Sequence, residues 1–373
     1  MKMLKEFVKK ETVFVISLLL ALVSMFFNPL GIEYLDNIDF RVLGILLGLM
    51  LIMSGFKRVG ILDNICLRLL GSVKNVRELT FVLVMLSFFS SMLITNDVAL
   101  VAFVPFAIYS LKKSGHEDKA IFVVVLQTIA ANLGSMLLPS GNPQNLYLYD
   151  LSGMSFVEFV VLLLPYAVTA LIMLSICMIL VKKEPVNIHN KGKMKISKKG
   201  KIFTVVYAIL FIMGILTVCR VLPYEIFLIA ALPAMAICDI RAYKGVDYFL
   251  LLTFVCFFIF IGNIRSIEIV RNTLEGIVKD RETVTGIIAS QFISNVPAAL
   301  MLSKFTDNYR ELIIGVDLGG LGTLIASMAS LISYKSYAVN FKETKGKYVI
   351  QFTIYNIIFL GALFGLYGLI KQF

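Results

Sequence analysis

The chain has 373 residues, of which 59% are hydrophobic and 16% are charged, and its formal net charge is +11. Soluble domains are about half apolar and about a quarter charged, so this composition excludes a soluble enzyme. A basic chain can bind nucleic acid, but here the basic residues are spread over several loops and form no folded basic face. No nucleic-acid partner is therefore expected.

Seven apolar runs are long enough to cross a bilayer, which takes about 20 residues. The first run follows several lysines without a small-residue cleavage site, so we expect a retained span and not a signal peptide. The sequence predicts an all-α polytopic protein of the plasma (inner) membrane, with the lipid bilayer as its partner. The seven runs are residues 12–30, 41–56, 155–181, 202–222, 225–240, 247–264 and 348–370.

Basic residues concentrate in alternate loops, which together hold 26 of the 35 Lys and Arg residues and 10 of the 24 Asp and Glu residues. Cytoplasmic loops carry the excess of Lys and Arg, so the N-terminus is predicted to be cytoplasmic and the C-terminus outside. These loops are the N-terminal tail and residues 57–78, 111–119, 182–201, 239–247 and 335–347.

Residues 79–111 are expected to form a re-entrant hairpin. Both ends adjoin basic loops, so the segment enters and leaves on the cytoplasmic side. Its apolar arms, about 16 and 14 residues long, are short for a full crossing. The arms meet at Thr95-Asn96-Asp97, which would lie near the middle of the membrane.

Residues 119–149 are expected to form a discontinuous helix. The segment begins as an apolar run and then breaks into GSMLLPSGNPQN, which contains Asn142 and Asn145. Gly, Pro and amides at this density do not fit a continuous helix. Non-helical backbone at membrane depth is tolerated only where it is buried in protein or lines a polar cavity.

The second half of the chain repeats this pattern, with a hairpin at residues 283–305 and a broken helix at residues 309–334. Its hairpin tip, Ser294-Asn295, corresponds to Thr95-Asn96. One more span precedes the second hairpin than the first, so residues 1–181 and 202–373 are predicted to be inverted repeats joined by a basic cytoplasmic linker, residues 182–201. The count is nine crossings and two hairpins, about 11 transmembrane elements.

The two broken helices align without gaps when shifted by 185 residues. Asn132 then falls on Asp317, Gly134 on Gly319, and Asn145 on Ser330. Matching interruptions in two halves indicate a secondary transporter with a site at the midplane.

The residues at the break points are of the types that begin helices. Ser294-Asn295 precedes Pro297, Asn142 precedes Pro143, and Thr95-Asn96-Asp97 also suits an N-cap. Half-helices that begin at mid-membrane direct free N–H groups at a shared cavity, which suits an anionic ligand. The alternative is that these are capped kinks that only aid packing.

Asp97 and Asp317 are the only Asp, Glu, Lys or Arg residues that this topology places well inside the membrane. Intramembrane ionisable residues are costly and usually functional, so each is a proton carrier or a cation ligand. The alternative is a buried, protonated N-cap for Asp97 and a shallow position for Asp317, which follows Arg310 by seven residues.

The sequence gives little support for catalysis or for a resident metal site. His116 and His189 fall in cytoplasmic loops, the five cysteines are scattered, and no phosphate-binding P-loop motif occurs. We therefore expect no enzyme activity, no cofactor and no resident metal, with a sodium ion near Asn96, Asp97 and Asn295 as the one exception.

The segments LITNDVALVAFVPFAI and ANLGSMLLPSGNPQNL resemble the ion transporter superfamily, specifically the arsenical-pump membrane protein and citrate-transporter-like anion permeases. The resemblance implies two inverted repeats, a homodimer, coupling to H⁺ or Na⁺, and a separate ATPase subunit if the chain is an arsenical pump. Relatives that move divalent anions with sodium carry Ser-Asn-Thr at both hairpin tips. Asp97 replaces the final Thr of the first tip, which is closer to arsenical pumps and sodium/proton antiporters. Val296 replaces it at the second tip, which therefore lacks this polar ligand.

The predicted function is secondary active transport of a small anion or oxyanion, of the arsenite or carboxylate type, coupled to a proton or sodium gradient by alternating access. A sodium/proton antiporter is the first alternative, and a channel-like or non-transporting membrane protein is the second. The residues expected to bind substrate or ion are Thr95, Asn96, Asp97, Asn132, Asn142, Asn145, Ser294, Asn295, Asp317, Ser327 and Ser330.

Overall fold

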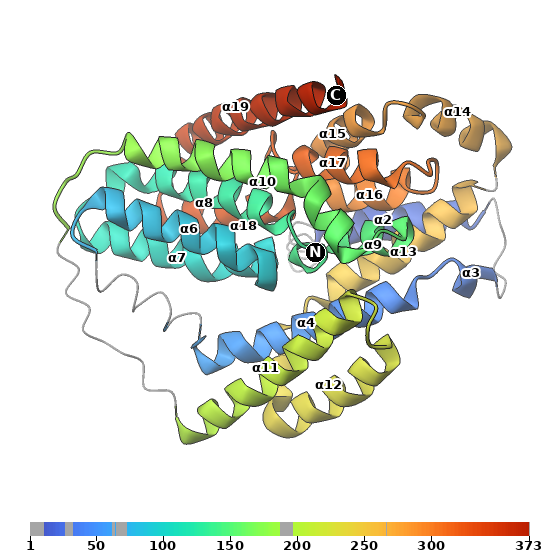
Figure 1. Ribbon diagram of the computed structural model, residues 1–373, viewed down its shortest axis with the longest axis horizontal. Helices are drawn as coiled ribbons and strands as arrows, with labels where there is room; N and C mark the ends of the chain where they lie inside the picture. The colour runs from blue at the N-terminus through green and yellow to red at the C-terminus, as the bar shows by residue number, and fades with distance from the viewer. Residues whose placement is uncertain are drawn as a thin grey trace, which may run out of the picture.

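The structure is a computed structural model that describes residues 11–26, 33–61, 64, 73–186, 197–265 and 267–372. Within these ranges the regular structure is helical (Figure 1), apart from one isolated β-bridge between Asn75 and Pro185. The predicted all-α class is confirmed. Residues 187–196 of the predicted linker lie outside the described residues, as do Cys66 and His189.

The helices follow the chain in two halves. The first half contains α2 (Thr12–Ser24), α3 (Glu33–Asp36), α4 (Phe40–Val59), α6 (Val76–Ile94), α7 (Asn96–Lys113), α8 (Ala120–Ser135), the turn η2 (Pro139–Gly141), α9 (Pro143–Ser152) and α10 (Phe156–Ile179). The second half contains α11 (Lys198–Val218), α12 (Tyr224–Asp239), the turn η3 (Ile240–Gly245), α13 (Tyr248–Arg265), α14 (Glu268–Val278), α15 (Glu282–Ile293), α16 (Asn295–Leu302), α17 (Tyr309–Gly319), α18 (Met328–Asn340) and α19 (Lys345–Gln372).

Seven described helices are long and apolar enough to cross a membrane. Six coincide with predicted spans: α4, α10, α11, α12, α13 and α19. The seventh is α6, which was expected to be a hairpin arm too short to cross. It reaches 19 residues because Asn75 caps its first turn by accepting a hydrogen bond from the backbone N–H of Glu78. The predicted first span, residues 12–30, contributes only the 13 residues of α2 to the described structure.

Outward-facing apolar side chains mark the lipid surface. On α10, Val161, Leu164, Val168, Ile172 and Ile176 recur every three or four residues and are 43–61% exposed. One face of a helix repeats at this spacing, so α10 presents an apolar stripe to its surroundings. Only 33% of its apolar window is buried, against 61% for α4, which places α10 at the periphery and α4 inside the bundle.

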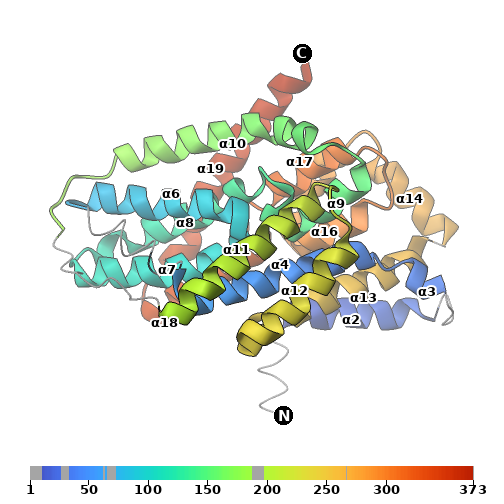
Figure 2. The same cartoon turned by 60° about the horizontal axis from the view of Figure 1, so that its bottom comes forward.

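The helices form two assemblies that can be followed in Figures 1 and 2. The helices α4, α11 and α12 pack on one another on one side of the molecule, and α10 and α19 lie on the other side. Between them, α8 is surrounded by α6, α7, α10, α18 and α19, while α17 contacts α15, α16 and α9.

The two halves of the chain exchange the second parts of their broken helices. The helix α9, from the first half, packs on α16 and α17 of the second half. Conversely, α18, from the second half, packs on α7 and α8 of the first half. Each broken helix therefore runs from one half into the other, so the interruptions lie at the boundary between the halves.

Both hairpins turn through the same backbone geometry. Thr95 joins α6 to α7 with φ 67° and ψ 151°, and Ser294 joins α15 to α16 with φ 72° and ψ 153°. The predicted side-chain caps at these two residues are wrong, since neither caps its helix through a hydrogen bond to a described residue. A capping residue has extended backbone with negative φ, as Asn142 has (φ −154°), and its side chain does accept from Asn145 N.

Two glycines allow the hairpins to pack closely on the broken helices. A Cβ atom at Gly134 of α8 would lie 2.1 Å from the Phe88 carbonyl oxygen of α6. A Cβ atom at Gly319 of α17 would lie 2.6 Å from Oγ of Ser290 in α15. Glycine at these corresponding positions is therefore required by the approach of neighbouring helices.

We expect Gly134→Ala to lower the free energy of unfolding by about 1–3 kcal/mol, because the added methyl group meets backbone that cannot rotate away. The measurement is thermal unfolding of the purified protein in detergent. Gly361→Ala in α19 is the matched control, since no described atom outside its own helix lies within 4 Å of the added Cβ. Equal stability of the two variants would contradict this packing.

Candidate solute and ion site

Asn132 on α8 joins the first hairpin tip to the second broken helix. Its side-chain oxygen accepts hydrogen bonds from Asn96 Nδ2 and Ser327 Oγ, both at 3.0 Å. Its side-chain nitrogen donates to Ser330 Oγ and to the Gly320 carbonyl oxygen, both at 3.4 Å. Asn132 is 5% exposed, so these bonds lie inside the protein, where leaving a polar group unpaired is costly.

Asp317 on α17 makes the corresponding junction in the opposite direction. Its Oδ1 atom accepts a hydrogen bond from Asn142 Nδ2 at 3.4 Å. The side chains of Gln144 and Asn145, at the start of α9, also approach the carboxyl group. Asp317 is 3% exposed, and the three amide residues are at most 2% exposed.

The two junctions are related by the same shift of 185 residues that aligns the sequence. Asn132 contacts Ser327 and Ser330, while Asp317 contacts Asn142 and Asn145. Each pair of contacts crosses between the halves. Such reciprocity is what an internal pseudo-twofold relation produces, and the inverted repeat itself stays a prediction.

The second hairpin tip is held against the loop that follows α17. The backbone N–H of Asn295 donates to the Ala326 carbonyl oxygen at 2.9 Å, and Ser294 Oγ donates to the same oxygen at 3.4 Å. Gln291 on α15 secures this loop by donating to the carbonyl oxygens of Gly319 and Leu321, at 3.0 and 2.9 Å.

A cavity of about 500 Å³ reaches the first hairpin tip. Its inner wall includes Thr95 and Asp97, together with Pro143 and Met328, the first residues of α9 and α18. Two of the three predicted half-helix starts, at Thr95 and at Pro143, therefore meet at one cavity, together with the start of α18. The third, Ser294-Asn295, contacts the loop described above.

The cavity is basic at the end away from the hairpin tip. Lys57 and Arg58 at the end of α4, and Arg241 and Lys244 on η3, line the cavity together with one acidic residue, Asp247. We call the part lined by the four basic residues the basic end. Arg58 is paired with Asp239 at 2.6 Å. At the inner end, Oδ1 of Asp97 is buried and finds no hydrogen-bond partner among the described residues.

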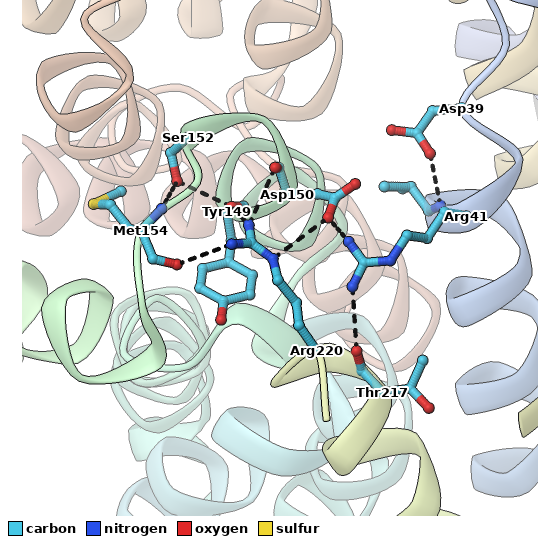
Figure 3. Close-up of polar contacts among 9 residues, drawn as sticks. Asp39, Arg41, Tyr149, Asp150, Ser152, Met154, Thr217 and Arg220 are labelled. Atoms are coloured by element: carbon cyan, nitrogen blue, oxygen red, sulfur yellow. Dashed lines mark hydrogen bonds and ion pairs between the residues drawn. The ribbon is translucent and has the colours of Figure 1, made fainter. Parts of the chain in front are cut away.

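An arginine pair joins three helices at the other end of α4 (Figure 3). Arg41, near the start of α4, and Arg220, just after α11, both form ion pairs with Asp150 at the end of α9. Along α4, Arg41 precedes Lys57 by 16 residues, which separates this cluster from the basic end by about 24 Å, at about 1.5 Å per residue.

Backbone contacts fix the same cluster. Arg220 donates to the carbonyl oxygens of Tyr149 and Met154, at 2.8 and 3.4 Å, and lies 4.8 Å from the centre of the Tyr149 ring. Arg41 donates to the Thr217 carbonyl oxygen at 3.3 Å. The arginine pair thereby ties the outer end of α9 to α4 and α11, the helices that pack with α12.

The predicted site residues thus fall into four places. Thr95 and Asp97 line the cavity; Asn96, Asn132, Ser327 and Ser330 form one junction; Asn142, Asn145 and Asp317 form the other; Ser294 and Asn295 contact Ala326. In the described part of the chain, no group of three or more His, Cys, Asp or Glu side chains could hold a metal ion.

The family of the chain follows from a comparison with known sequences. The model of the citrate transporter family matches residues 9–316, which include both hairpins, the first broken helix and most of the second half. The chain belongs to the citrate transporter family. It is an integral, multi-pass membrane transporter of the citrate and anion permease type.

Individual relatives agree with this assignment. An uncharacterized transporter of Methanocaldococcus jannaschii is 29% identical over 323 residues, which cover 86% of each chain. The inner membrane protein YbiR of Escherichia coli is 28% identical over 302 residues, or 80% of each chain. The silicon efflux transporter LSI3 of rice is 30% identical over 129 residues, which are 35% of this chain and 26% of the rice protein.

Several residues of the site were not predicted from the sequence. Gln144 lies within the quoted GSMLLPSGNPQN segment, and its position beside two candidate asparagines is the signal that could have identified it. Gln291 and the cluster of Arg41, Asp150 and Arg220 carry no such signal, because their partners are distant in the sequence.

We expect Asp150→Asn to lower the free energy of unfolding by about 1–3 kcal/mol, because two guanidinium groups lose the charge that holds them together. Thermal unfolding in detergent measures the loss. Asp118→Asn is the matched control: Asp118 is also paired with a cation, Lys119, but its side chain is 64% exposed, and surface changes of this kind stay within about 0.5 kcal/mol. An Asp150 variant as stable as this control would refute the role of the cluster.

Proposed function

We propose that this family member is a secondary carrier for a small, oxygen-rich solute, either a carboxylate or an oxyanion of the arsenite type. The proposal is based on the cavity, because the cavity joins the basic end of the bundle to Asp97 and to the starts of α9 and α18. The basic end would face the cytoplasm of a plasma-membrane protein, in line with the excess of Lys and Arg in those loops.

The ion pairs at the opposite end favour an alternating-access carrier, and they argue against a channel. The cavity approaches the hairpin tip from one side, while Arg41, Asp150 and Arg220 tie α9 to α4 and α11 at the other end. A carrier needs one side open and the other closed at any moment. This arrangement corresponds to a carrier open to its basic side.

The chemistry of the interior supports coupling to a cation. Arg58 is paired with Asp239, and the other basic residues of the basic end would draw an anion towards the cavity. The carboxyl group of Asp97, however, lies at its inner end. An ionised Asp97 would repel an anion strongly in this low-dielectric surrounding. An anion therefore has to arrive with a proton or a sodium ion, whereas a neutral hydroxylated acid could donate hydrogen bonds to Asp97 directly.

A sodium/proton antiporter is the second candidate. The observation in its favour is the pair of carboxyl groups, Asp97 and Asp317, among amides and hydroxyls at the centre of the protein. In that case the same residues would exchange the two cations without a solute.

Proteoliposomes containing the purified protein distinguish these functions. The panel is arsenite, silicic acid, citrate, succinate, phosphate and sulfate, each tested with and without proton and sodium gradients; silicic acid enters because a rice relative bears the name silicon efflux transporter. We expect saturable uptake of at least one solute, accelerated by a cation gradient. Saturable sodium movement with none of the solutes would replace this proposal by the antiporter.

We further expect Asp97→Asn to abolish the dependence of transport on the ion gradient, because an amide cannot take up and release a proton or neutralise a cation. Initial rates with and without the gradient measure this effect. Asp307→Asn, an exposed aspartate outside the cavity lining, is the control and should retain full coupling. Unchanged coupling in the Asp97 variant would remove this residue from the mechanism.

A further inference from the structure

A second cavity, with a volume of about 520 Å³, lies between α10, α17 and α19. Its wall includes Val157, Val161 and Ile370, which are 44–68% exposed. Val161 also belongs to the apolar stripe of α10, and α10 and α19 lie along the same side of the molecule (Figure 1). We call this cavity the lateral groove, because it is continuous with the apolar surface of the bundle. None of the described residues lines both this groove and the cavity beside Asp97.

The lining of the lateral groove changes from charged to apolar with depth. Each of the three helices places a charged residue at its end and an apolar or aromatic residue one to two turns further in: Glu158 and then Pro165 on α10, Arg310 and then Ile314 on α17, and Lys371 and then Tyr367 on α19. A bilayer has the same order, with charged headgroups outside a hydrocarbon core, and tyrosine is enriched where the two regions meet. The groove therefore has the polarity profile of a membrane lipid.

The charged end of the groove presents two cations and one anion to a ligand. The side chains of Arg310, Lys371 and Glu158 are 54–58% exposed. Arg310 lies 3.7 Å from Glu158, and an exposed ion pair of this kind is weak enough to open for a ligand. Glu311 is only 22% exposed, and two hydroxyl groups donate hydrogen bonds to its Oε2 atom. The accessible groups therefore match a headgroup that contains both a phosphate and a positively charged amine.

We propose that the lateral groove binds one phospholipid with a primary amine in its headgroup, of the phosphatidylethanolamine type. Arg310 and Lys371 bind the phosphate through charge-assisted hydrogen bonds. Glu158 accepts a hydrogen bond from the amine through Oε1, because its Oε2 atom already accepts from the backbone N–H of Ser155. One acyl chain lies along the apolar wall of α10, which includes Val161.

The arrangement of charges discriminates between headgroups of different chemistry. A choline headgroup carries a positive charge but has no N–H group, so it cannot donate to Glu158. A glycerol headgroup brings no positive charge, so Glu158 would face the lipid phosphate without compensation. The ethanolamine headgroup satisfies all three charged side chains. This site goes beyond the proposed transport function and does not depend on it.

The test is native mass spectrometry of the purified protein in detergent that contains phosphatidylethanolamine, phosphatidylcholine or phosphatidylglycerol with identical acyl chains. Thermal unfolding is measured in parallel. We expect one phosphatidylethanolamine per chain, bound about tenfold more tightly than phosphatidylcholine because of the hydrogen bond to a charged group. The same lipid should raise the midpoint of thermal unfolding, since it binds only the folded state.

Two variants separate the phosphate contact from the amine contact. Arg310→Gln should weaken binding of all three phospholipids by about tenfold. Glu158→Gln should remove the preference for ethanolamine over choline, while glutamine still serves in the capping box with Ser155. Both side chains are exposed, so both variants should fold. The matched control is Arg271→Gln on α14, since Arg271 is also paired with a glutamate, Glu275, and lies outside the groove lining.

Equal phospholipid binding by the Arg310 variant and the Arg271 control would overturn the site. Equal affinity of the unchanged protein for the ethanolamine and choline lipids would do the same. Occupation of the groove by a second copy of the chain would appear as a dimer without bound phospholipid and would also contradict the proposal. Because no transported solute is present, these results are independent of the transport assay.

Discussion

The hydrogen bonds that cross between the two halves of the chain determine the rest of this architecture. Asn132 binds Ser327 and Ser330 in the other half, and Asp317 binds Asn142 in return. Breaking either junction would leave buried polar groups unpaired, at a cost of about 1–3 kcal/mol for each group. The helices α9 and α18 are therefore held inside the opposite half, and their first residues meet at the cavity.

The short helix α9 links the interior to one end of the bundle. Its cap, Asn142, contacts Asp317 at one end, and Asp150 contacts Arg41 and Arg220 at the other. The ten residues of α9 therefore connect the Asp317 junction in the interior to the arginine pair at one end of the bundle.

Much of this organisation could be predicted from the sequence, because polar residues that interrupt apolar runs are visible without a structure. The breaks at Thr95, Asn142 and Ser294, and the central position of Asn132, all follow from that signal. The side-chain caps at Thr95 and Ser294 did not form because both residues adopt positive φ. The length of α6 and the contacts of Gln291 and Arg220 depend on tertiary packing, and the inverted topology, the homodimer and an ATPase partner stay predictions.

The central claim is that the cavity at the first hairpin tip opens to the basic side. The most direct test of this claim measures the accessibility of position 95 to a thiol reagent. A cysteine is placed at this residue in a variant whose five native cysteines are replaced by serine or alanine. It is then exposed to a charged, membrane-impermeant thiol reagent in inside-out and right-side-out vesicles. The account predicts rapid modification from the cytoplasmic side and protection by the transported solute. Modification only from the outside, or equally from both sides and without protection, would contradict it.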